Sequence, residues 1–373
     1  MSYVAVKGGA GAIGAAHQLI AETLYPKDNA SDTPVDQIQQ QLDQHLRLGI
    51  DRIMAEASLY DRDIAAQAFL QAQGDSIEAV FIVRAYRATL SRFLDAEPLK
   101  LSDSQPQRHV SAAFKDVPGG QQLGATYDYS HRLLGYFLHL PAPQNAAEPT
   151  TKPEDDASET RHSGVMQLLE QEGLIETSTA ALTEENRDIT QIPPGFPASR
   201  AQRLQTLARA DEGFLLGMAY STQRGYGQNH PFIAELRQGS VNVEITPPEL
   251  GFTICIGQIS MTECQMINQF HGDTPEQATF TRGYGLVFGH NERKAIAMAL
   301  LDRALRAPEL GEKVQAPAQD EEFVLSHCDN VEATGFVEHL KLPHHVDFQS
   351  EIATLRALRA HPKKGRTEHP DGL

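Results

Sequence analysis

The sequence predicts an α+β fold, with a mainly helical N-terminal domain that includes short strands and a mixed α/β C-terminal domain. Between residues 35 and 96 apolar side chains recur at helical spacing, as in VDQIQQQLDQHLRLGIDRI. Farther along, VNVEI and FTICIGQI flank the turn sequence PPELG, which is the pattern of two paired strands. A chain of 373 residues is long enough to bury substantial cores and to form two domains.

The composition narrows the classes of partner. The net charge of −17 argues against nonspecific binding to nucleic acid or to an anionic membrane, so an anionic substrate would need a local basic pocket. No apolar run approaches the roughly 20 residues that span a bilayer, and no secretory signal precedes the strand-like YVAV. Three scattered cysteines fit neither a disulfide framework nor a CxxC metal motif. We therefore expect a reduced protein of the cytoplasm.

The first predicted element is a short strand at Tyr3–Val6, followed by a glycine-rich turn and an Ala-rich helix. Gly9, Gly11 and Gly14 satisfy the GxGxxG pattern of dinucleotide-binding folds. That site also needs a second parallel strand that ends in an acid about 20 residues later. Here a polar loop at 28–34 leads into another helix, so we expect a glycine turn rather than a dinucleotide site.

Helices are predicted to continue to about residue 96. Asp61 and Asp75 stand immediately before two helical segments, where a carboxylate can accept hydrogen bonds from free backbone amides, so we predict both as N-caps. The last helix carries three arginines among apolar residues: Arg84, Arg87 and Arg92. Such arginines are usually solvated or paired with nearby acids, and a partner interface is the less favoured alternative.

The middle of the chain is predicted to be largely irregular. A strand is expected at His109–Lys115, and Asp128 with His131 forms a weak site candidate that helix capping explains equally well. Residues 141–162 are rich in proline, acids and small polar residues, which is typical of a linker. One helix, VMQLLEQEGLI, is expected before a second irregular segment, 183–199. We therefore expect an N-terminal domain at 1–141, a linker and irregular segment at 142–199, a C-terminal domain at 200–355 and a basic tail at 356–373.

Two Arg/Gly segments stand out in the C-terminal part. The letters RGYG occur at 224–227, after a helical segment broken at Asp211, and again at 282–285. Glycines let a loop present backbone amides to an anion, and an arginine adds a fork of donors. Anion contacts by at least one of these loops, or two turns that repeat by chance, are both consistent with the sequence.

A further candidate for anion binding is the start of the helix ERKAIAMALLDRAL. Asn291 is predicted to cap this helix, and its first turn holds Arg293 and Lys294. Cations in a first turn oppose the helix dipole, and a bound anion would relieve that repulsion. A phosphate is therefore one interpretation of this turn, and a solvated charged turn is the slightly favoured other.

The segment Ala318–Gln349 combines acids, histidines and apolar residues more densely than any other. Its candidate acid/base residues are Asp320, Glu321, Glu322 and Asp329. His339 and His344 are five positions apart, so they share neither a helix face nor a strand face and can converge only if the chain bends at Lys341–Pro343. Two converging imidazoles would form half of a zinc site; otherwise they are ordinary surface histidines.

Several long segments are distinctive: MSYVAVKGG, DEGFLLGMAYSTQRGYGQNHPF, FTRGYGLVFG, ERKAIAMALLDRAL, AQDEEFVLSH and DNVEATGFVEHLKLPHHVDFQ. From Tyr3 to about Leu355 the chain resembles the PhnI family, core subunits of the bacterial carbon–phosphorus lyase complex. The resemblance implies that, with partner subunits, the chain displaces adenine from C1′ of ATP by methylphosphonate, giving α-D-ribose 1-methylphosphonate 5-triphosphate. It implies that the chain alone is a purine nucleosidase, which hydrolyses ATP or GTP to the free base and ribose triphosphate.

Such a displacement has an oxocarbenium-like transition state, so it needs an acid for the leaving base and cations for the triphosphate. By residue type, the candidates for binding the triphosphate are Arg224, Arg282, Arg293 and Lys294. The candidates for catalytic acid/base roles are Asp320, Glu321, Glu322 and Asp329.

The resemblance also implies a metal and several partners. His339 and His344 match the family's HLKLPH motif, which implies zinc ligands near a subunit interface, although His345 stands where relatives are expected to have an aromatic residue. Residues of a partner would complete the coordination. The implied partners are the core subunits PhnG, PhnH and PhnJ and an ABC-type ATPase subunit, PhnL, with PhnK as a further candidate.

The main alternative is a non-catalytic scaffold that positions the radical subunit which breaks the carbon–phosphorus bond. The chain has no three-cysteine cluster for an iron–sulfur centre, so it should not carry out the radical step itself. A third interpretation is a regulator that binds ATP without consuming it. Release of the base from ATP by the isolated chain would separate a catalyst from both alternatives.

Overall fold

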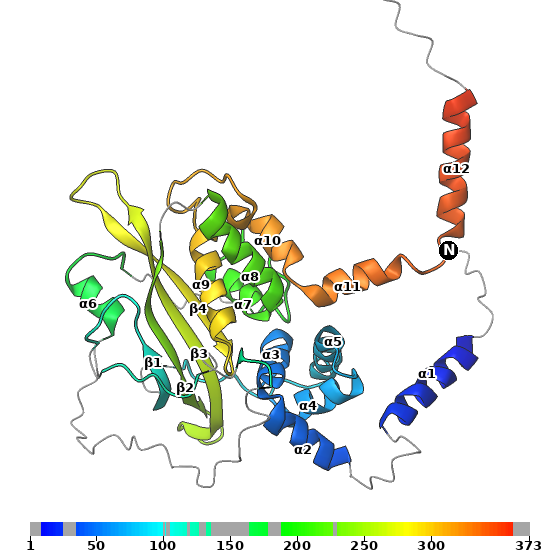
Figure 1. Ribbon diagram of the computed structural model, residues 1–373, viewed down its shortest axis with the longest axis horizontal. Helices are drawn as coiled ribbons and strands as arrows, with labels where there is room; N and C mark the ends of the chain where they lie inside the picture. Colours follow the sequence, from blue (N-terminus) through cyan, green and yellow to red (C-terminus); the bar gives the residue numbers. More distant parts are fainter. Residues whose placement is uncertain are drawn as a thin grey trace, which may run out of the picture. The chain divides into compact units, whose positions relative to one another are not determined.

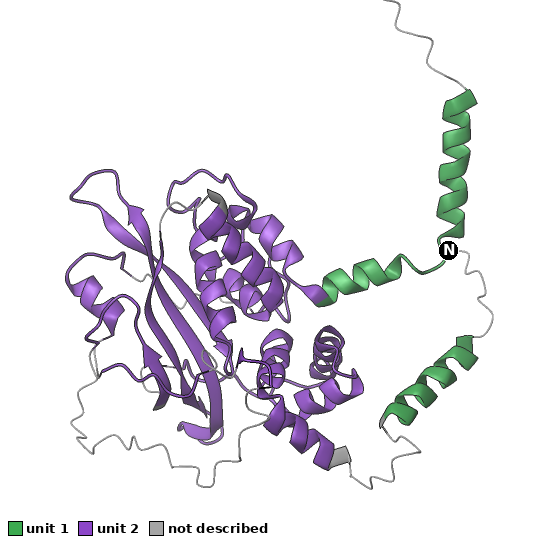
Figure 2. Ribbon diagram, viewed as in Figure 1, with its two compact units in different colours: residues 1–30, 331–373 green, residues 31–330 purple. Residues whose placement is uncertain are grey.

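The computed structural model describes residues 9–24, 35–99, 101, 105–117, 120–126, 132–135, 164–177, 188–226 and 230–360. The chain divides into two units, one made of residues 31–330 and the other of residues 1–30 with 331–373 (Figure 2). Asp128, His131, the expected strand at Tyr3–Val6 and most of the expected linker lie outside the described residues. The expected division into four parts stays a prediction.

The 31–330 unit is built on one antiparallel sheet of four strands in the order β1-β2-β3-β4 (Figure 1). The strands are β1 (Gln105–Val110), β2 (Phe232–Ile245), β3 (Ile254–His271) and β4 (Thr279–Phe288). The predicted strand pair is confirmed as β2 and β3, which pair with Ser240 opposite Ser260. The strand expected at His109–Lys115 is displaced toward the N-terminus: β1 ends at Val110, and residues 111–117 are irregular.

Helix α9 (Glu292–Leu305) packs directly on β4, and two glycines make this possible. A Cβ atom at Gly283 would lie 2.1 Å from the carbonyl oxygen of Ala299, and one at Gly285 would lie 2.0 Å from that of Ala295. Both glycines belong to the second RGYG segment, which we expected as a loop. That expectation is wrong: the segment lies inside β4, where its glycines allow the helix backbone to approach the strand.

The main core lies between this sheet face and a layer of helices. Helices α7 (Arg200–Arg209) and α8 (Glu212–Ser221) join α9 on one side of the sheet, and α6 (Val165–Gln171) lies on the other (Figure 1). Fully buried members of the main core are Leu207, Leu215, Met298 and Leu301. The predicted break at Asp211 is confirmed, because its side chain accepts a hydrogen bond from Phe214 N at 2.7 Å and starts α8.

The expected N-terminal helices are present as α2 (Val35–His45), α3 (Arg47–Ala57), α4 (Arg62–Gln71) and α5 (Ser76–Arg87). The expected end near residue 96 is wrong, because α5 ends at Arg87 and residues 88–99 are not helical. Asp61 accepts a hydrogen bond from Ile64 N, and Asp75 accepts from the amides of Ile77 and Glu78, so both predicted N-caps are confirmed. The expected Asn291 cap is wrong in its detail. Asn291 occupies the N-cap position of α9, but its side chain donates to the Phe288 carbonyl at 2.6 Å and makes no cap hydrogen bond.

The remaining described helices are α10 (Glu321–His327), α11 (Asn330–His339), α12 (His345–Ala360) and α1 (Gly9–Leu24). The glycine run at the start of α1 is helical from Gly9 onward, so the expected glycine turn is wrong there. Helices concentrate in the N-terminal part and the sheet in the C-terminal part, which confirms the α+β class. Within the described ranges, no helix combines the length and apolarity needed to cross a membrane.

Candidate functional site

His339 and His344 meet at the connection between α11 and α12. Helix α11 ends at His339, and a turn closed by the Leu342 amide on the His339 carbonyl at 3.0 Å bends the chain before α12 starts. The two Nε2 atoms lie 3.1 Å apart, and the rings are nearly perpendicular, with an interplanar angle of 77°. The bend that the sequence required at Lys341–Pro343 is present, and it brings the two imidazoles together.

The backbone fixes the tautomer of both rings. His339 Nδ1 lies 3.0 Å from the Phe336 carbonyl oxygen, and His344 Nδ1 lies 2.7 Å from that of Leu342. A carbonyl can only accept, so each Nδ1 carries its proton and each neutral ring leaves a lone pair on Nε2. Two facing lone pairs need a proton or a metal cation between them.

The donor set fits zinc in type and spacing. Two imidazoles at Zn–N distances of 2.0–2.1 Å and a tetrahedral angle place their nitrogens roughly 3.3 Å apart. Nδ1–H bonded to a backbone carbonyl is the usual support for a histidine ligand. Among the residues that the structure describes, however, no group of three or more His, Cys, Asp or Glu side chains could hold a metal. The described part of this chain therefore offers two ligands at this point.

The four candidate acids belong to the 31–330 unit. Asp320 caps α10 by accepting from Phe323 N at 3.0 Å. Glu321 accepts from Ala198 N at 2.5 Å and lies 3.3 Å from an Arg203 nitrogen. Through these contacts Asp320 and Glu321 both stabilise the local fold.

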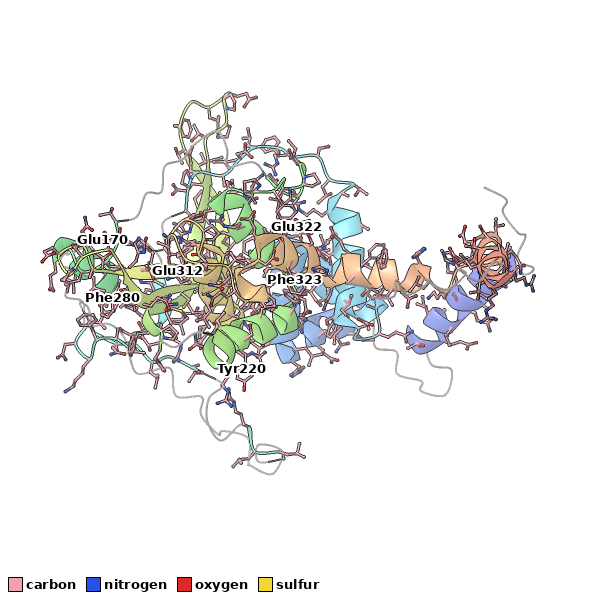
Figure 3. All side chains as sticks on the ribbon, turned by 90° about the horizontal axis from the view of Figure 1, so that it is seen from above. Glu170, Tyr220, Phe280, Glu312, Glu322 and Phe323 are labelled. Carbon is pink, nitrogen blue, oxygen red and sulfur yellow. The ribbon has the colours of Figure 1, made fainter. Side chains whose placement is uncertain are left out.

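The other two acids differ in exposure. Asp329 pairs with Arg84 at 2.6 Å, which ties α5 to the end of α10. Glu322 is exposed on α10, next to Phe323 (Figure 3). A general acid must reach solvent or substrate to exchange its proton, so exposure makes Glu322 the most accessible of the four.

The four candidates for binding a triphosphate occupy contrasting environments. Arg224 is exposed in a π-helical turn (Thr222–Tyr226). Arg293 is 71% exposed and pairs with Glu212 at 2.8 Å. Arg282 is mostly buried, where it donates to Glu170 Oε1 at 2.6 Å and to the Glu176 carbonyl.

Lys294, the fourth candidate, is fully buried. Among the described residues its Nζ has no hydrogen-bond partner, and its ion pair with Glu56 Oε1 is long, at 3.9 Å. Burial lowers the pKa of Lys294 to about 8, against an opposing effect of Glu56, and burial also raises the pKa of Glu56. Both shifts favour neutral side chains, so desolvation dominates this pair.

Glu56 and Arg52 of α3 were not predicted from the sequence. Arg52 Nε donates to Glu56 Oε1 at 2.8 Å, and the Glu212 amide donates to the same oxygen at 3.1 Å. The network thus joins α3, α8 and α9 around Lys294. The sequence around Arg52 and Glu56 shows only an ordinary helix. It cannot reveal that Lys294 lies beside them, because that contact depends on the tertiary fold.

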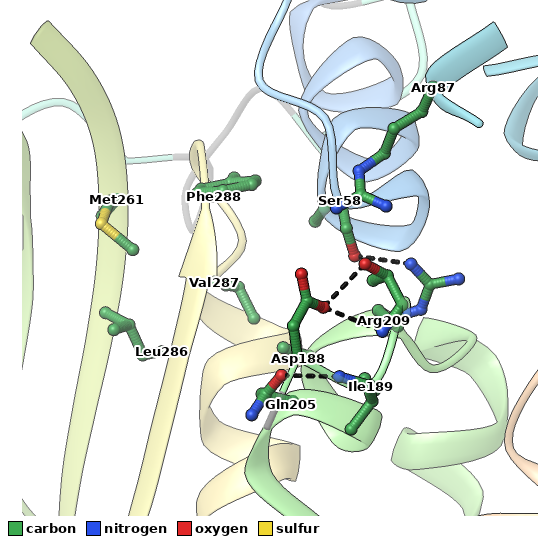
Figure 4. A pocket seen from close by; sticks show the side chains of 13 residues that line it. Ser58, Arg87, Asp188, Ile189, Gln205, Arg209, Met261, Leu286, Val287 and Phe288 are labelled. Carbon is green, nitrogen blue, oxygen red and sulfur yellow. Dashed lines mark hydrogen bonds between the residues drawn. The ribbon is translucent and has the colours of Figure 1, made fainter. Parts of the chain in front are cut away.

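A cavity of about 210 Å³ lies between the edge of β4 and the helices α3, α5 and α7. Figure 4 shows Met261, Leu286 and Val287 on the strand side and Arg87 with Arg209 on the helix side. Burial lowers the pKa of Arg209 to about 10, and the nearby Arg84 and Arg87 add to this effect. The sequence analysis identified Arg87 as an arginine among apolar residues, but nothing in the sequence pattern distinguished Arg209.

A family profile and three curated proteins match this chain. The profile of a family described as bacterial phosphonate metabolism protein (PhnI) matches residues 2–362. Alpha-D-ribose 1-methylphosphonate 5-triphosphate synthase subunit PhnI of Rhizobium meliloti (strain 1021) is 51% identical over 373 residues, which cover 100% of this chain and 98% of that protein. Its namesake in Escherichia coli (strain K12) is 50% identical over 97% of this chain and 100% of its own length. Putative C-P lyase subunit protein HtxH of Stutzerimonas stutzeri is 43% identical over 95% of each chain.

Proposed function

Because the chain belongs to the PhnI family of bacterial phosphonate metabolism proteins, as its sequence predicts, we propose that it is a subunit of an α-D-ribose 1-methylphosphonate 5-triphosphate synthase. The observation that carries this proposal is identity of 50–51%, over essentially the whole chain, to two proteins of that name. A subunit acts with others, and the proposed partners in the cytoplasm are PhnG, PhnH, PhnJ and an ATPase subunit, PhnL, with PhnK as a further candidate.

The proposed reaction is a transfer of ribose 5-triphosphate from ATP to methylphosphonate. An oxygen of the phosphonate forms a bond to C1′ while the bond from C1′ to N9 of adenine breaks. The electron pair of that bond stays on the base, which takes up one proton. Without the phosphonate, water would take the same place, and the chain would act as a purine nucleosidase on ATP or GTP.

The roles proposed for individual residues follow the needs of this step. Charge develops on the leaving base and on the sugar, while the triphosphate stays anionic throughout. Exposure supports Arg224 and Arg293 as contacts for the triphosphate. Arg282 and Lys294 complete the proposed set; like Arg293, each already lies beside a carboxylate of this chain. The proposed acid/base residues are Asp320, Glu321, Glu322 and Asp329, and accessibility favours Glu322.

His339 and His344 are proposed to hold zinc together with residues of a partner subunit. The support is the geometry of the pair, whose two Nε2 lone pairs converge 3.1 Å apart while both Nδ1 atoms are engaged. A bound zinc ion would supply a Lewis acid for a phosphate or sugar oxygen. The chain's own contribution is to hold both imidazoles in the ligating tautomer.

The test is a chromatographic assay of adenine released from ATP by the full chain, alone and with its partner subunits, with and without methylphosphonate. The His339→Ala/His344→Ala double variant should lose at least tenfold in turnover if the pair contributes to the reaction, since supporting a metal is worth at least that much. His345→Ala is the matched control, because it removes the adjacent exposed imidazole.

The outcomes separate the proposals. Release that survives the double variant and a chelator would remove the histidine pair from the reaction and leave it an interface element. No release by the chain alone, but release by the assembled complex, would refute the nucleosidase and keep the synthase. If every candidate acid and cation can be replaced without loss in an active complex, the scaffold alternative replaces catalysis by this chain.

A further inference from the structure

The cavity between β4, α3, α5 and α7 has two chemically distinct sides. Met261, Leu286, Val287 and Phe288 line the strand side, where Val287 points toward the helices, and Arg87 with Arg209 lies on the helix side (Figure 4). Arg209 Nη1 donates to the hydroxyl of Ser58 at 3.0 Å, which aims the guanidinium along the cavity wall. The cavity is therefore amphipathic: its strand side is apolar, and two arginines and the carboxylate of Asp188 lie on its other side.

Asp188 also lines the cavity, but among the described residues the acids near the cavity pair with groups other than Arg87 and Arg209. Arg84 pairs with Asp329 at 2.6 Å, and Arg92 pairs with Asp188. The other carboxylate oxygen of Asp188 accepts from the amide and hydroxyl of Thr190 at 2.8 and 2.7 Å. Within the described part of the chain, no carboxylate lies within ion-pair distance of Arg87 or Arg209. In a protein of net charge −17, two such arginines beside one cavity mark a local anion site.

The size of the cavity limits the ligand. About 210 Å³ is below the roughly 300 Å³ at which pockets for drug-sized ligands begin. A nucleoside triphosphate is too large, and a single small oxyanion would leave the apolar wall unused. Two guanidinium forks suit a doubly charged tetrahedral group, because each fork can engage two of its oxygens. The wall suits a short hydrocarbon substituent on the same molecule.

We propose that this cavity binds a short alkylphosphonate, with Arg87 and Arg209 holding the oxyanion and the Leu286–Phe288 wall covering the alkyl group. The choice of a phosphonate among small anions rests on the proposed function, whereas the anion site rests on the cavity. Burial is the main cause that lowers the pKa of Arg209, and the charges of Arg84 and Arg87 add to it, so a bound anion would stabilise the charged guanidinium.

The test is isothermal titration of the full chain with ethylphosphonate, methylphosphonate and inorganic phosphate. Wild type should bind ethylphosphonate most tightly, with affinity rising about fourfold for each buried carbon. Arg87→Gln and Arg209→Gln should each weaken binding about tenfold or more, because each removes a charge-assisted contact. Arg209→Lys keeps the positive charge but loses the two-pronged guanidinium, so its affinity should lie between those of the wild type and Arg209→Gln.

Arg356→Gln is the matched control, since it removes one arginine from an exposed position of α12 and should leave binding unchanged. Arg87 makes no side-chain hydrogen bond within the described residues, so Arg87→Gln should fold even if a variant at Arg209 does not. Thermal melting checks this.

Three results would overturn the proposal. These are no saturable binding by wild type at millimolar ligand, equal binding by Arg87→Gln and Arg356→Gln, or phosphate binding as tightly as ethylphosphonate. Titration does not need turnover, so its failure is distinct from failure of the synthase proposal. In an active complex, Arg87→Gln should raise the KM for methylphosphonate and leave that for ATP unchanged.

Discussion

Lys294 shows at the scale of one residue how burial changes chemistry. Its side chain is fully buried, its pKa is lowered to about 8, and Glu56 compensates it only across 3.9 Å. In the unfolded chain the same amine has a pKa near 10.4. Between the two values the unfolded state binds more protons, so the free energy of unfolding rises with pH in that window and the gain is lost as pH falls.

We predict from this an effect of Lys294→Met on the pH dependence of stability. Between about pH 8 and 10.4, the free energy of unfolding of the wild type should rise by on the order of 3 kcal/mol relative to that of the variant. Glu56 keeps its hydrogen bond from Arg52 in the variant, so the protein should still fold. Chemical denaturation across this pH range measures the difference. Lys313→Met removes an exposed lysine and should show no such slope; a variant curve parallel to wild type would contradict the assigned pKa.

At the scale of elements, the packing of α9 on β4 depends on two glycines. The backbone of the helix lies so near the strand that a methyl group at Gly285 would meet the Ala295 carbonyl at 2.0 Å. Neither the helix nor the strand could move without disturbing the core that includes Met298 and Leu301. Sequence reasoning missed this, because the need for glycine arises from a helix that follows later in the chain.

Gly285→Ala should therefore destabilise the protein by about 2 kcal/mol or more, as overpacking in a filled core does. Urea unfolding gives the value. Gly257→Ala is the matched control, because Gly257 also lies in a strand and a Cβ there meets nothing within 4 Å. Equal stability of the two variants would show that α9 can move away from β4 at little cost.

At the scale of the whole molecule, the two units differ in how many of their apolar side chains are buried. The 31–330 unit contains the main core, whereas none of the described residues of α11 or α12 is buried. Several large apolar side chains on these two helices are more than 60% exposed: Phe336, Val337, Val346, Phe348 and Leu358. A helix without buried contacts is weakly held, since helical stability in proteins comes mostly from tertiary packing.

We predict that amides of α11 and α12 in the isolated chain exchange with solvent orders of magnitude faster than those of β3 and α9. Hydrogen exchange followed by mass spectrometry measures this. Slowing of α11 and α12 on addition of the partner subunits would place the interface there. Slow exchange in the chain by itself would mean that these helices are held without a partner.

The sequence predicted what depends on neighbouring residues. Asp61, Asp75 and Asp211 were identified as boundaries because capping acts within one turn, and the strand pair was visible because hairpins are local. Burial of Lys294 beside Glu56 and the pairing of Arg84 with Asp329 were not predicted, since they join helices that are far apart in sequence. The proximity of His339 and His344 was an intermediate case: the spacing showed that a bend was needed, and only the structure supplies it.

The buried amine of Lys294 can also be used to measure local opening of the fold. Near pH 8 a large fraction of this amine is uncharged and nucleophilic, yet the closed fold shields it completely. An acylating reagent can reach it only while α3, α8 and α9 separate. The rate at which Lys294 is acylated therefore measures how often these helices separate, and the measurement needs no engineered probe.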